Sequence, residues 1–500
     1  MFFFSFSVNV LPILKAEVIK YVISFRSVLP PDAVKVSVPH LINLLTSKSI
    51  VVHTYAAAAI EKILILQPNN IPLVQQADIS PLASTTYNNL LAALSVQGSE
   101  QNEYVMKAMM RITNAIKTDM MQHAGLIVPQ LVMKLQIVTK NPTKPHYIHY
   151  LFETLSIVIK VVCSSVDSAV GEFDRNLFPI FQEILQNEVD SLIPYVFQIL
   201  SLLLERQKGD IPEPYMALLP FLVLPALWER PGYVTPMVRL LQSFIEKAHM
   251  NIVQMGKLEA ILGVFNKLNA SKTNDHEAFY LLQSLLINLP EQFLTNYWNQ
   301  IFSIMFKRLT SSKTTKYIKS LLVFFSLFTC HCSAVKLIQI IENLQNGMFT
   351  MVIERLIISE LQKVSGEIER KICAVGMANI IATPEVYSGK FANHWPALVE
   401  CVVKLFEQPE DSGLPNNEHF IDVESAPAFQ GSSARLLNAA KSNNDPLQGK
   451  VDNPKVFLAQ QLSQLSQSQP GTMQGRLGQM PQEFQAHIMS YLQMAGVSLV

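Results

Sequence analysis

One short motif has the residue types of a metal site. Cys330, His331 and Cys332 bring together two thiols and an imidazole, which are ligands that zinc prefers. The motif lies inside an apolar run, where a helix turns successive side chains about 100° apart, so the three cannot converge on one ion. No second ligand pair follows at a suitable spacing. We expect a buried pair of cysteines and no metal.

A second candidate cluster consists of His146, His149 and Glu153. Spacings of three and four residues place all three on one face of a helix. The His-Glu-x-x-His arrangement of zinc peptidases is absent from the sequence. We therefore expect a surface or groove-lining patch and not a metal site.

Motifs for nucleotide and acyl-transfer chemistry are missing from the sequence. It contains no Walker A motif, no Gly-x-Gly-x-x-Gly and no Gly-x-Ser-x-Gly. No nucleophile has a base and an orienting acid nearby in sequence, although such triads assemble through space. We expect a protein that binds partners without catalysis, and that uses no cofactor.

The charge composition narrows the class of partner. Among 500 residues, 49% are hydrophobic and 16% are charged, with 39 lysines and arginines against 39 aspartates and glutamates. A net charge of zero disfavours a general nucleic-acid-binding protein, which carries a basic excess. The longest apolar runs, residues 321–330 and 217–228, are half the length of a membrane-spanning helix. We expect neither nucleic-acid binding nor membrane insertion.

The elements that position all these residues are helices. Apolar residues recur at spacings of three and four, for example at Tyr195, Ile199, Leu202 and Leu203. Short breaks carrying proline, glycine or asparagine separate the periodic segments, so consecutive helices should pack antiparallel. This pattern predicts an all-α fold.

An aromatic residue recurs near the start of the long apolar helices at an average interval of about 44 residues. The residues are Tyr55, Tyr104, Tyr147, Tyr195, Tyr233, Tyr280 and Tyr317. Two antiparallel helices in about 40–47 residues form a HEAT repeat, and such hairpins stack because each buries only one face alone. We expect a HEAT-repeat α-solenoid, a right-handed superhelix of about nine repeats over residues 10–404. The alternative is a chance periodicity of tyrosines.

Changes in amino-acid composition along the chain predict the remaining domain boundaries. Residues 1–9 form an atypical N-terminal segment, and residues 405–434 are expected to form an acidic loop. Residues 435–500 are expected to form an irregular C-terminal cap that ends in a helix over residues 482–495.

Two clusters of like charge are the candidate binding residues. The basic turn comprises Lys307, Arg308, Lys313, Lys316 and Lys319, in a window without any acid. The acidic segment, residues 405–434, holds Glu407, Glu410, Asp411, Glu418, Asp422 and Glu424 without a lysine or arginine. These clusters suggest two surfaces for oppositely charged protein partners. Ordinary solvated faces are the alternative.

Several stretches of sequence resemble one known family. They include residues 49–57, 102–111, 193–205, 312–316 and 371–376, and the likeness extends from about residue 10 to the C-terminus. Together they resemble the importin-α re-exporters, which are exportins of the karyopherin-β family. Members of that family are about twice this length, so the resemblance covers their C-terminal half.

The resemblance implies a HEAT superhelix that binds importin-α together with GTP-bound Ran. It further implies passage along nuclear pore proteins and shuttling between nucleus and cytoplasm. In related karyopherins, acidic loops meet basic surfaces of Ran, so the charge of the stretch from Glu407 to Glu424 makes it a candidate secondary contact for Ran. The charge of the basic turn alone makes it a candidate contact for an acidic segment of importin-α. The family's main Ran-binding repeats lie outside the matched half. A truncated product without independent export activity and a general HEAT scaffold are therefore the alternatives.

Overall fold

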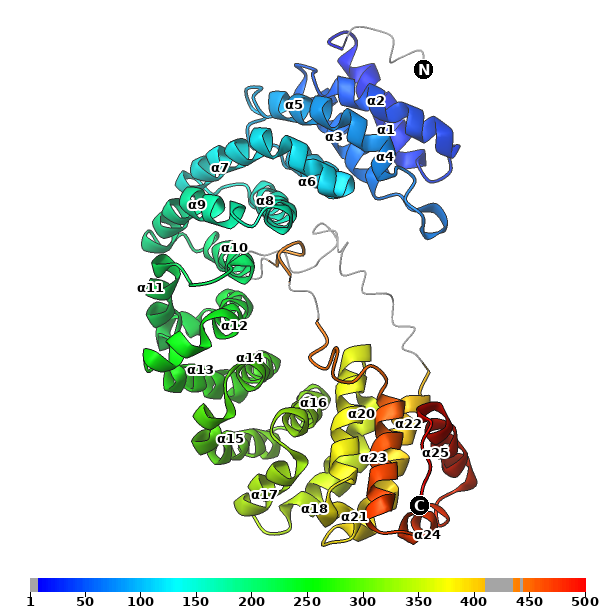
Figure 1. Ribbon diagram of the computed structural model, residues 1–500. Coiled ribbons are helices and arrows are strands. Elements are labelled where there is room, and N and C mark those ends of the chain that lie inside the picture. Colours follow the sequence, from blue (N-terminus) through cyan, green and yellow to red (C-terminus); the bar gives the residue numbers. More distant parts are fainter. Residues whose placement is uncertain (1–7, 410–434, 441–443) are drawn as a thin grey trace. The chain divides into compact units, whose positions relative to one another are not determined.

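The computed structural model describes residues 8–409, 435–440 and 444–500, and every regular element in these ranges is helical. The all-α prediction is confirmed. The chain divides into two compact units. In the described ranges, unit 1 holds residues 8–215, 230–240 and 435–440, and unit 2 holds residues 216–229, 241–409 and 444–500. Figure 1 shows the helices of both units.

The helices of unit 1 form two rows. One row stacks α1, α3, α6, α8 and α10, whereas α7 and α9 pack together in the other row. Each helix of the first row thus covers the apolar face of the one before it, as expected for stacked helical hairpins. The helices are α1 (Pro12–Phe25), α2 (Pro31–Leu44), α3 (Ile50–Leu64), α4 (Gln76–Ile79), α5 (Ala83–Ala93), α6 (Glu103–Ile116), α7 (Ala124–Lys140), α8 (Pro145–Ser165), α9 (Ala169–Gln186) and α10 (Ile193–Arg206). Two further helices have residues in both units, α11 (Glu213–Leu222) and α12 (Pro231–Gln254).

The recurring tyrosines mark one helix of each pair. Each lies within the first two turns of α3, α6, α8, α10, α12, α14 or α16, so the repeat period read from the sequence matches the spacing of the helices. Their burial differs, however, because Tyr317 is fully buried whereas Tyr280 is 49% exposed. Tyr195 stacks on Phe152 of the preceding α8 at 4.7 Å between ring centroids, which shows how such an aromatic joins neighbouring repeats.

Helix α8 is an apolar helix of 21 residues. Among the described residues it is the one helix with the length and composition to cross a membrane. Of its most apolar 18-residue stretch, 78% is buried inside the protein. The core helix of a protein can have this length and composition as well. Its apolar surface is used in packing against α6 and α10.

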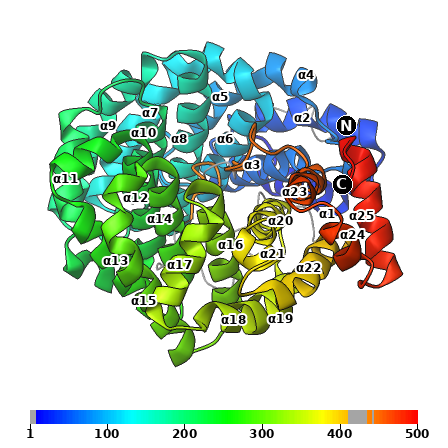
Figure 2. The same cartoon turned by 60° about the horizontal axis from the view of Figure 1, so that its bottom comes forward.

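Unit 2 continues the same mode of packing. Helices α14, α16, α20 and α22 pack in succession, and α13, α15 and α17 form a second row; Figure 2 shows α16, α20 and α22 in unit 2. The helices are α13 (Leu258–Ala270), α14 (Asp275–Asn288), α15 (Trp298–Ser311), α16 (Thr315–His331), α17 (Ala334–Leu344), α18 (Met348–Val352), α19 (Ile358–Glu360), α20 (Glu367–Ile381), α21 (Pro384–Tyr387), α22 (Trp395–Glu407), α23 (Pro454–Ser468), α24 (Thr472–Leu477) and α25 (Gln482–Ala495).

One glycine determines how closely α16 and α20 approach. A Cβ atom added to Gly376 would lie 2.3 Å from Cβ and 2.4 Å from Cα of Ser326. The Thr329 hydroxyl of α16 donates to the Gly376 carbonyl at 3.3 Å. Only glycine lets these two backbones come so near, because any larger residue would push the helices apart.

The C-terminal part differs from the expected acidic loop and irregular cap. Helix α22 extends to Glu407, so the first three residues of the acidic segment are helical. Helix α25 occupies the residues expected for the terminal helix, and it packs on α23 and α22. Residues 435–440 belong to unit 1, although the described residues on either side of them in sequence belong to unit 2.

Candidate partner-binding surface

The basic turn lies where α15 ends and α16 begins. Helix α15 ends at Ser311, and the Thr314 side chain caps α16 by accepting a hydrogen bond from the backbone N–H of Tyr317 at 3.2 Å. A threonine N-cap followed by the apolar run of α16 accounts for this helix start. The turn therefore places Lys307 and Arg308 on one helix and Lys316 and Lys319 on the next.

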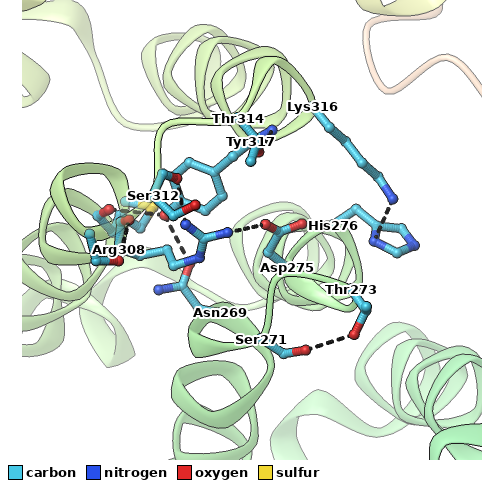
Figure 3. A network of polar contacts seen from close by, with 12 residues as sticks. Asn269, Ser271, Thr273, Asp275, His276, Arg308, Ser312, Thr314, Lys316 and Tyr317 are labelled. Carbon is cyan, nitrogen blue, oxygen red and sulfur yellow. Dashed lines mark hydrogen bonds and ion pairs between the residues drawn. The ribbon is translucent and has the colours of Figure 1, made fainter.

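Arg308 is buried and belongs to the core of unit 2 (Figure 3). Its guanidinium donates to the Asp275 carboxylate at 2.7 Å and to the Ser312 carbonyl at 2.6 Å. It also lies over the ring of Tyr317, 4.9 Å from the centroid. The Tyr317 hydroxyl lies 2.9 Å from Asn269 Oδ1, and burial raises the pKa of this phenol.

The prediction that Arg308 is a partner-binding residue of the basic turn is therefore wrong. Its charge is balanced inside the protein by Asp275, so it offers nothing to a partner. The sequence did contain a signal for this. Ile301 and Met305 are buried on α15, and Arg308 follows them at helical spacing on the same face.

Lys316 is exposed and has a partner on the preceding repeat. Its ammonium group donates to Nδ1 of His276 at 3.0 Å (Figure 3). Burial lowers the pKa of His276, and the nearby Lys316 lowers it further, while Glu277 and Asp275 oppose the shift. The imidazole is thus held neutral as an acceptor, and the pair keeps the single positive charge of the lysine.

Lys313 shares one carboxylate with a lysine that sequence analysis missed. Glu360 lies 3.9 Å from Lys313 and 2.8 Å from Lys363, and both lysine side chains are 53% exposed. One acid therefore balances two cations. Lys319 donates to the Ser365 hydroxyl at 3.3 Å, which adds no negative charge. Lys363 follows Lys319 by about one repeat period, and this spacing was the available signal.

The structure describes one acidic residue of the proposed Ran contact, Glu407. Its carboxylate accepts from Lys455 of α23 at 2.7 Å and from Tyr491 of α25 at 2.5 Å. The hydrogen bond from Lys455, followed by that from Tyr491, lowers the pKa of Glu407. Glu407 thus joins the C-terminal helices and is not part of an unpaired acidic loop. Glu410, Asp411, Glu418, Asp422 and Glu424 lie outside the described residues.

The cysteine and histidine candidates do not gather into a metal site in the described ranges. Within them, no group of three or more His, Cys, Asp or Glu side chains is placed to hold an ion. Burial raises the pKa of Cys330 to about 11, which keeps this thiol protonated. His149 and Glu153 are buried rather than on a surface patch, and they lie 3.8 Å apart.

The basic turn without Arg308 remains a surface of excess positive charge. Lys307, Lys313 and Lys316 are exposed, Lys319 is half-buried, and Lys363 adds a further cation. Such a surface can attract an acidic protein segment, and exposed charges of this kind are screened by salt.

Two family models match the chain. The model described as "CAS/CSE protein, C-terminus" matches residues 61–491, and the model described as "Cse1" matches residues 5–60. The second match begins within residues 1–9, the segment that the sequence analysis sets apart.

Curated relatives agree with these matches. The chain is 44% identical to exportin-2 of Danio rerio over 499 residues, and 44% identical to exportin-2 of Homo sapiens over 501 residues. Each comparison covers 99% of this chain, but 51% and 52% of the respective relative. The chain therefore spans about half the length of the curated relatives that it matches.

Solved structures share the fold. A structure described as the exportin Cse1 in its cargo-free, cytoplasmic state superimposes with a TM-score of 0.81 and 25% sequence identity, covering 96% of this chain and 49% of that one. A second structure, of the bidirectional nuclear transport receptor Lph2 of S. cerevisiae, has a TM-score of 0.53 and 14% identity, and it supports the fold alone. These likenesses confirm the predicted HEAT-repeat solenoid architecture.

Proposed function

Because the chain belongs to the CAS/CSE protein family, we propose that it acts in nuclear export as a transport receptor that binds protein partners without catalysis. Its partners would be importin-α and the GTP-bound form of Ran, and it would move between nucleus and cytoplasm along nuclear pore proteins. The observation that carries the proposal is the match of the family model over residues 61–491. The general HEAT scaffold is not favoured, since both curated relatives named above are exportins.

The basic turn is the part of unit 2 that would contact an acidic segment of importin-α. Its support is the excess of exposed lysines, with Glu360 shared by two of them and Lys316 bonded to a neutral histidine. Complementary charge of this kind fixes register and speeds encounter more than it adds affinity.

Binding to purified importin-α, with and without GTP-loaded Ran, tests the function. A complex that forms only with GTP-loaded Ran supports a receptor competent by itself. Binding that appears only when the rest of a full-length relative is supplied supports the truncated alternative. If no complex forms under either condition, the proposed function is contradicted.

A charge reversal tests the surface separately. Lys313→Glu, Lys316→Glu and Lys319→Glu together should weaken importin-α binding at least tenfold at low salt, and less at high salt because salt screens exposed charges. The matched control reverses three exposed lysines of unit 1, Lys48, Lys140 and Lys144, and should leave binding unchanged. Equal effects of the two triple variants would remove the basic turn from the interface.

We propose that acidic residues of the segment 405–434 other than Glu407 contact Ran. Glu410→Lys with Asp411→Lys should weaken Ran-dependent assembly in a full-length context, and unchanged affinity at low salt would refute this contact. Glu407 is left intact because its carboxylate stabilises the packing of α23 and α25.

A further inference from the structure

A six-residue segment, residues 435–440, binds to the surface of α8 and α10 within unit 1. Figure 1 shows this short orange segment beside α10. It lies more than 200 residues from both helices in sequence, and it forms no helix of its own. We call it the docked segment.

The docked segment supplies the hydrogen bonds that a buried carboxylate needs. Glu153 of α8 is 2% exposed, and it accepts from the backbone N–H groups of Leu437 at 2.6 Å and Asn438 at 3.0 Å. The Asn438 side chain donates a third bond at 2.7 Å. Among the described residues, every hydrogen bond to this carboxylate comes from the docked segment.

Two further polar contacts and two apolar side chains complete the fit. The backbone N–H of Leu436 donates to Gln198 Oε1 of α10 at 2.7 Å, and Lys160 donates to the Ala440 carbonyl at 3.4 Å. Leu436 is 1% exposed and Ala439 is 4% exposed. Gln198 is itself buried.

A separate peptide in the same turn could form this set of contacts as well. Glu153 and Gln198 accept hydrogen bonds from consecutive backbone N–H groups, which any peptide in the same turn has. The buried positions of Leu436 and Ala439 favour a leucine and a small residue. Burial raises the pKa of Glu153, and the hydrogen bonds from Asn438 and Leu437 oppose that rise. Without an occupant, the carboxylate would lose all three of these hydrogen bonds.

The docked segment forms few stabilising contacts in relation to the conformational entropy that it loses on binding. It buries two apolar side chains and forms the five hydrogen bonds named above, whereas six residues lose their backbone freedom. The balance between these opposing contributions favours a segment that releases and rebinds.

We propose that the surface of α8 and α10 around Glu153 and Gln198 is a peptide-binding site, that residues 435–440 are its intramolecular occupant, and that this occupant exchanges with peptides of the same chemistry. A suitable peptide has a leucine, an asparagine and a small residue in one turn. An aspartate in place of the leucine is excluded, because it would bury a charge at the position where Leu436 is 1% exposed. The inference concerns this chain alone and does not depend on the transport function.

Binding in trans tests the proposal. In the full chain, residues 435–440 are replaced by alternating glycine and serine, and the probe is a labelled peptide, Arg-Leu-Leu-Asn-Ala-Ala, with blocked ends. Fluorescence anisotropy should show saturable binding to the replaced chain and at least tenfold weaker binding to the intact chain. A peptide with aspartate in place of the first leucine should not bind. Absence of saturable binding to a folded replaced chain, or equal binding to both chains, would overturn the proposal.

A second measurement does not rely on the replaced chain. In the intact chain, Glu153→Gln should increase hydrogen exchange at the backbone N–H groups of Leu437 and Asn438 at least tenfold. Glu183→Gln, at an exposed position of α9, is the matched control and should have no effect there. Unchanged exchange in the Glu153→Gln variant would refute the role of this carboxylate.

Discussion

The guanidinium of Arg308 lies 2.7 Å from the carboxylate of Asp275, and both side chains are almost completely buried between α14, α15 and α16. The neighbouring Lys307 is exposed. Two adjacent cations thus have opposite roles, since one stabilises the core of unit 2 and the other faces solvent.

Removing Arg308 should destabilise unit 2. We expect Arg308→Ala to lower the free energy of unfolding by about 3–5 kcal/mol, because Asp275 would be left buried without its partner. Urea unfolding followed by tryptophan fluorescence measures this, since one of the three tryptophans, Trp298, lies on the same helix as Arg308. Lys307→Ala should change stability by less than about 0.5 kcal/mol. Equal effects of the two variants would contradict the structural role of Arg308.

A methyl group at the crossing of α16 and α20 should also destabilise the protein. Gly376→Ala would bring a Cβ to within 2.4 Å of the Ser326 backbone, so we expect a loss of about 1–3 kcal/mol in unfolding free energy. The matched control is Gly263→Ala in α13, where the new Cβ would meet no atom within 4 Å beyond its chain neighbours and the backbone of its own helix. That variant should gain up to about 1 kcal/mol, because alanine favours a helix over glycine. A neutral Gly376→Ala would show that the helices can move apart freely.

Acidification should weaken the attachment of the C-terminal helices. The hydrogen bonds from Lys455 and Tyr491 lower the pKa of Glu407 in the folded protein. A lowered pKa means that the stabilisation is fully present above the unfolded value of about 4.3 and is lost as the pH falls through the folded value. Glu407→Gln should therefore reduce the melting temperature at pH 7, and the difference from the unmodified chain should shrink below about pH 4. Glu483→Gln, at an exposed site on α25, should show no such pH dependence. A difference that persists unchanged to pH 3 would exclude Glu407 ionisation as the cause.

The first helix should promote self-association. Ile13, Tyr21 and Phe25 of α1 are exposed, Ile13 by 77%, and Val28 in the turn that follows α1 is 76% exposed. Large apolar groups gathered on one surface favour association. Light scattering should show particle mass rising with concentration, and Ile13→Glu with Val28→Glu should reduce that rise. A monodisperse monomer at all concentrations would contradict this prediction.

The sequence by itself determined the fold class and the repeat. Apolar residues at spacings of three and four specify amphipathic helices, and short polar breaks make neighbouring helices antiparallel. Because each repeat contacts only its neighbours, a period seen along the chain is also a period in space. The helix over residues 482–495 was anticipated for the same local reason, and the structure has α25 over these residues.

Only the tertiary structure decided which charges are exposed. The positive charges of Lys307 and Arg308 cannot be told apart by composition, and the difference arises because α14 brings Asp275 against one face of α15. The sequence predicted that Glu407 belongs to an acidic loop. In the structure, its carboxylate accepts hydrogen bonds from α23 and α25, which lie later in the chain. The partners of Glu153 lie about 285 residues away. No local pattern encodes such pairs, because a buried charge is specified by what packs against it and not by its neighbours in sequence.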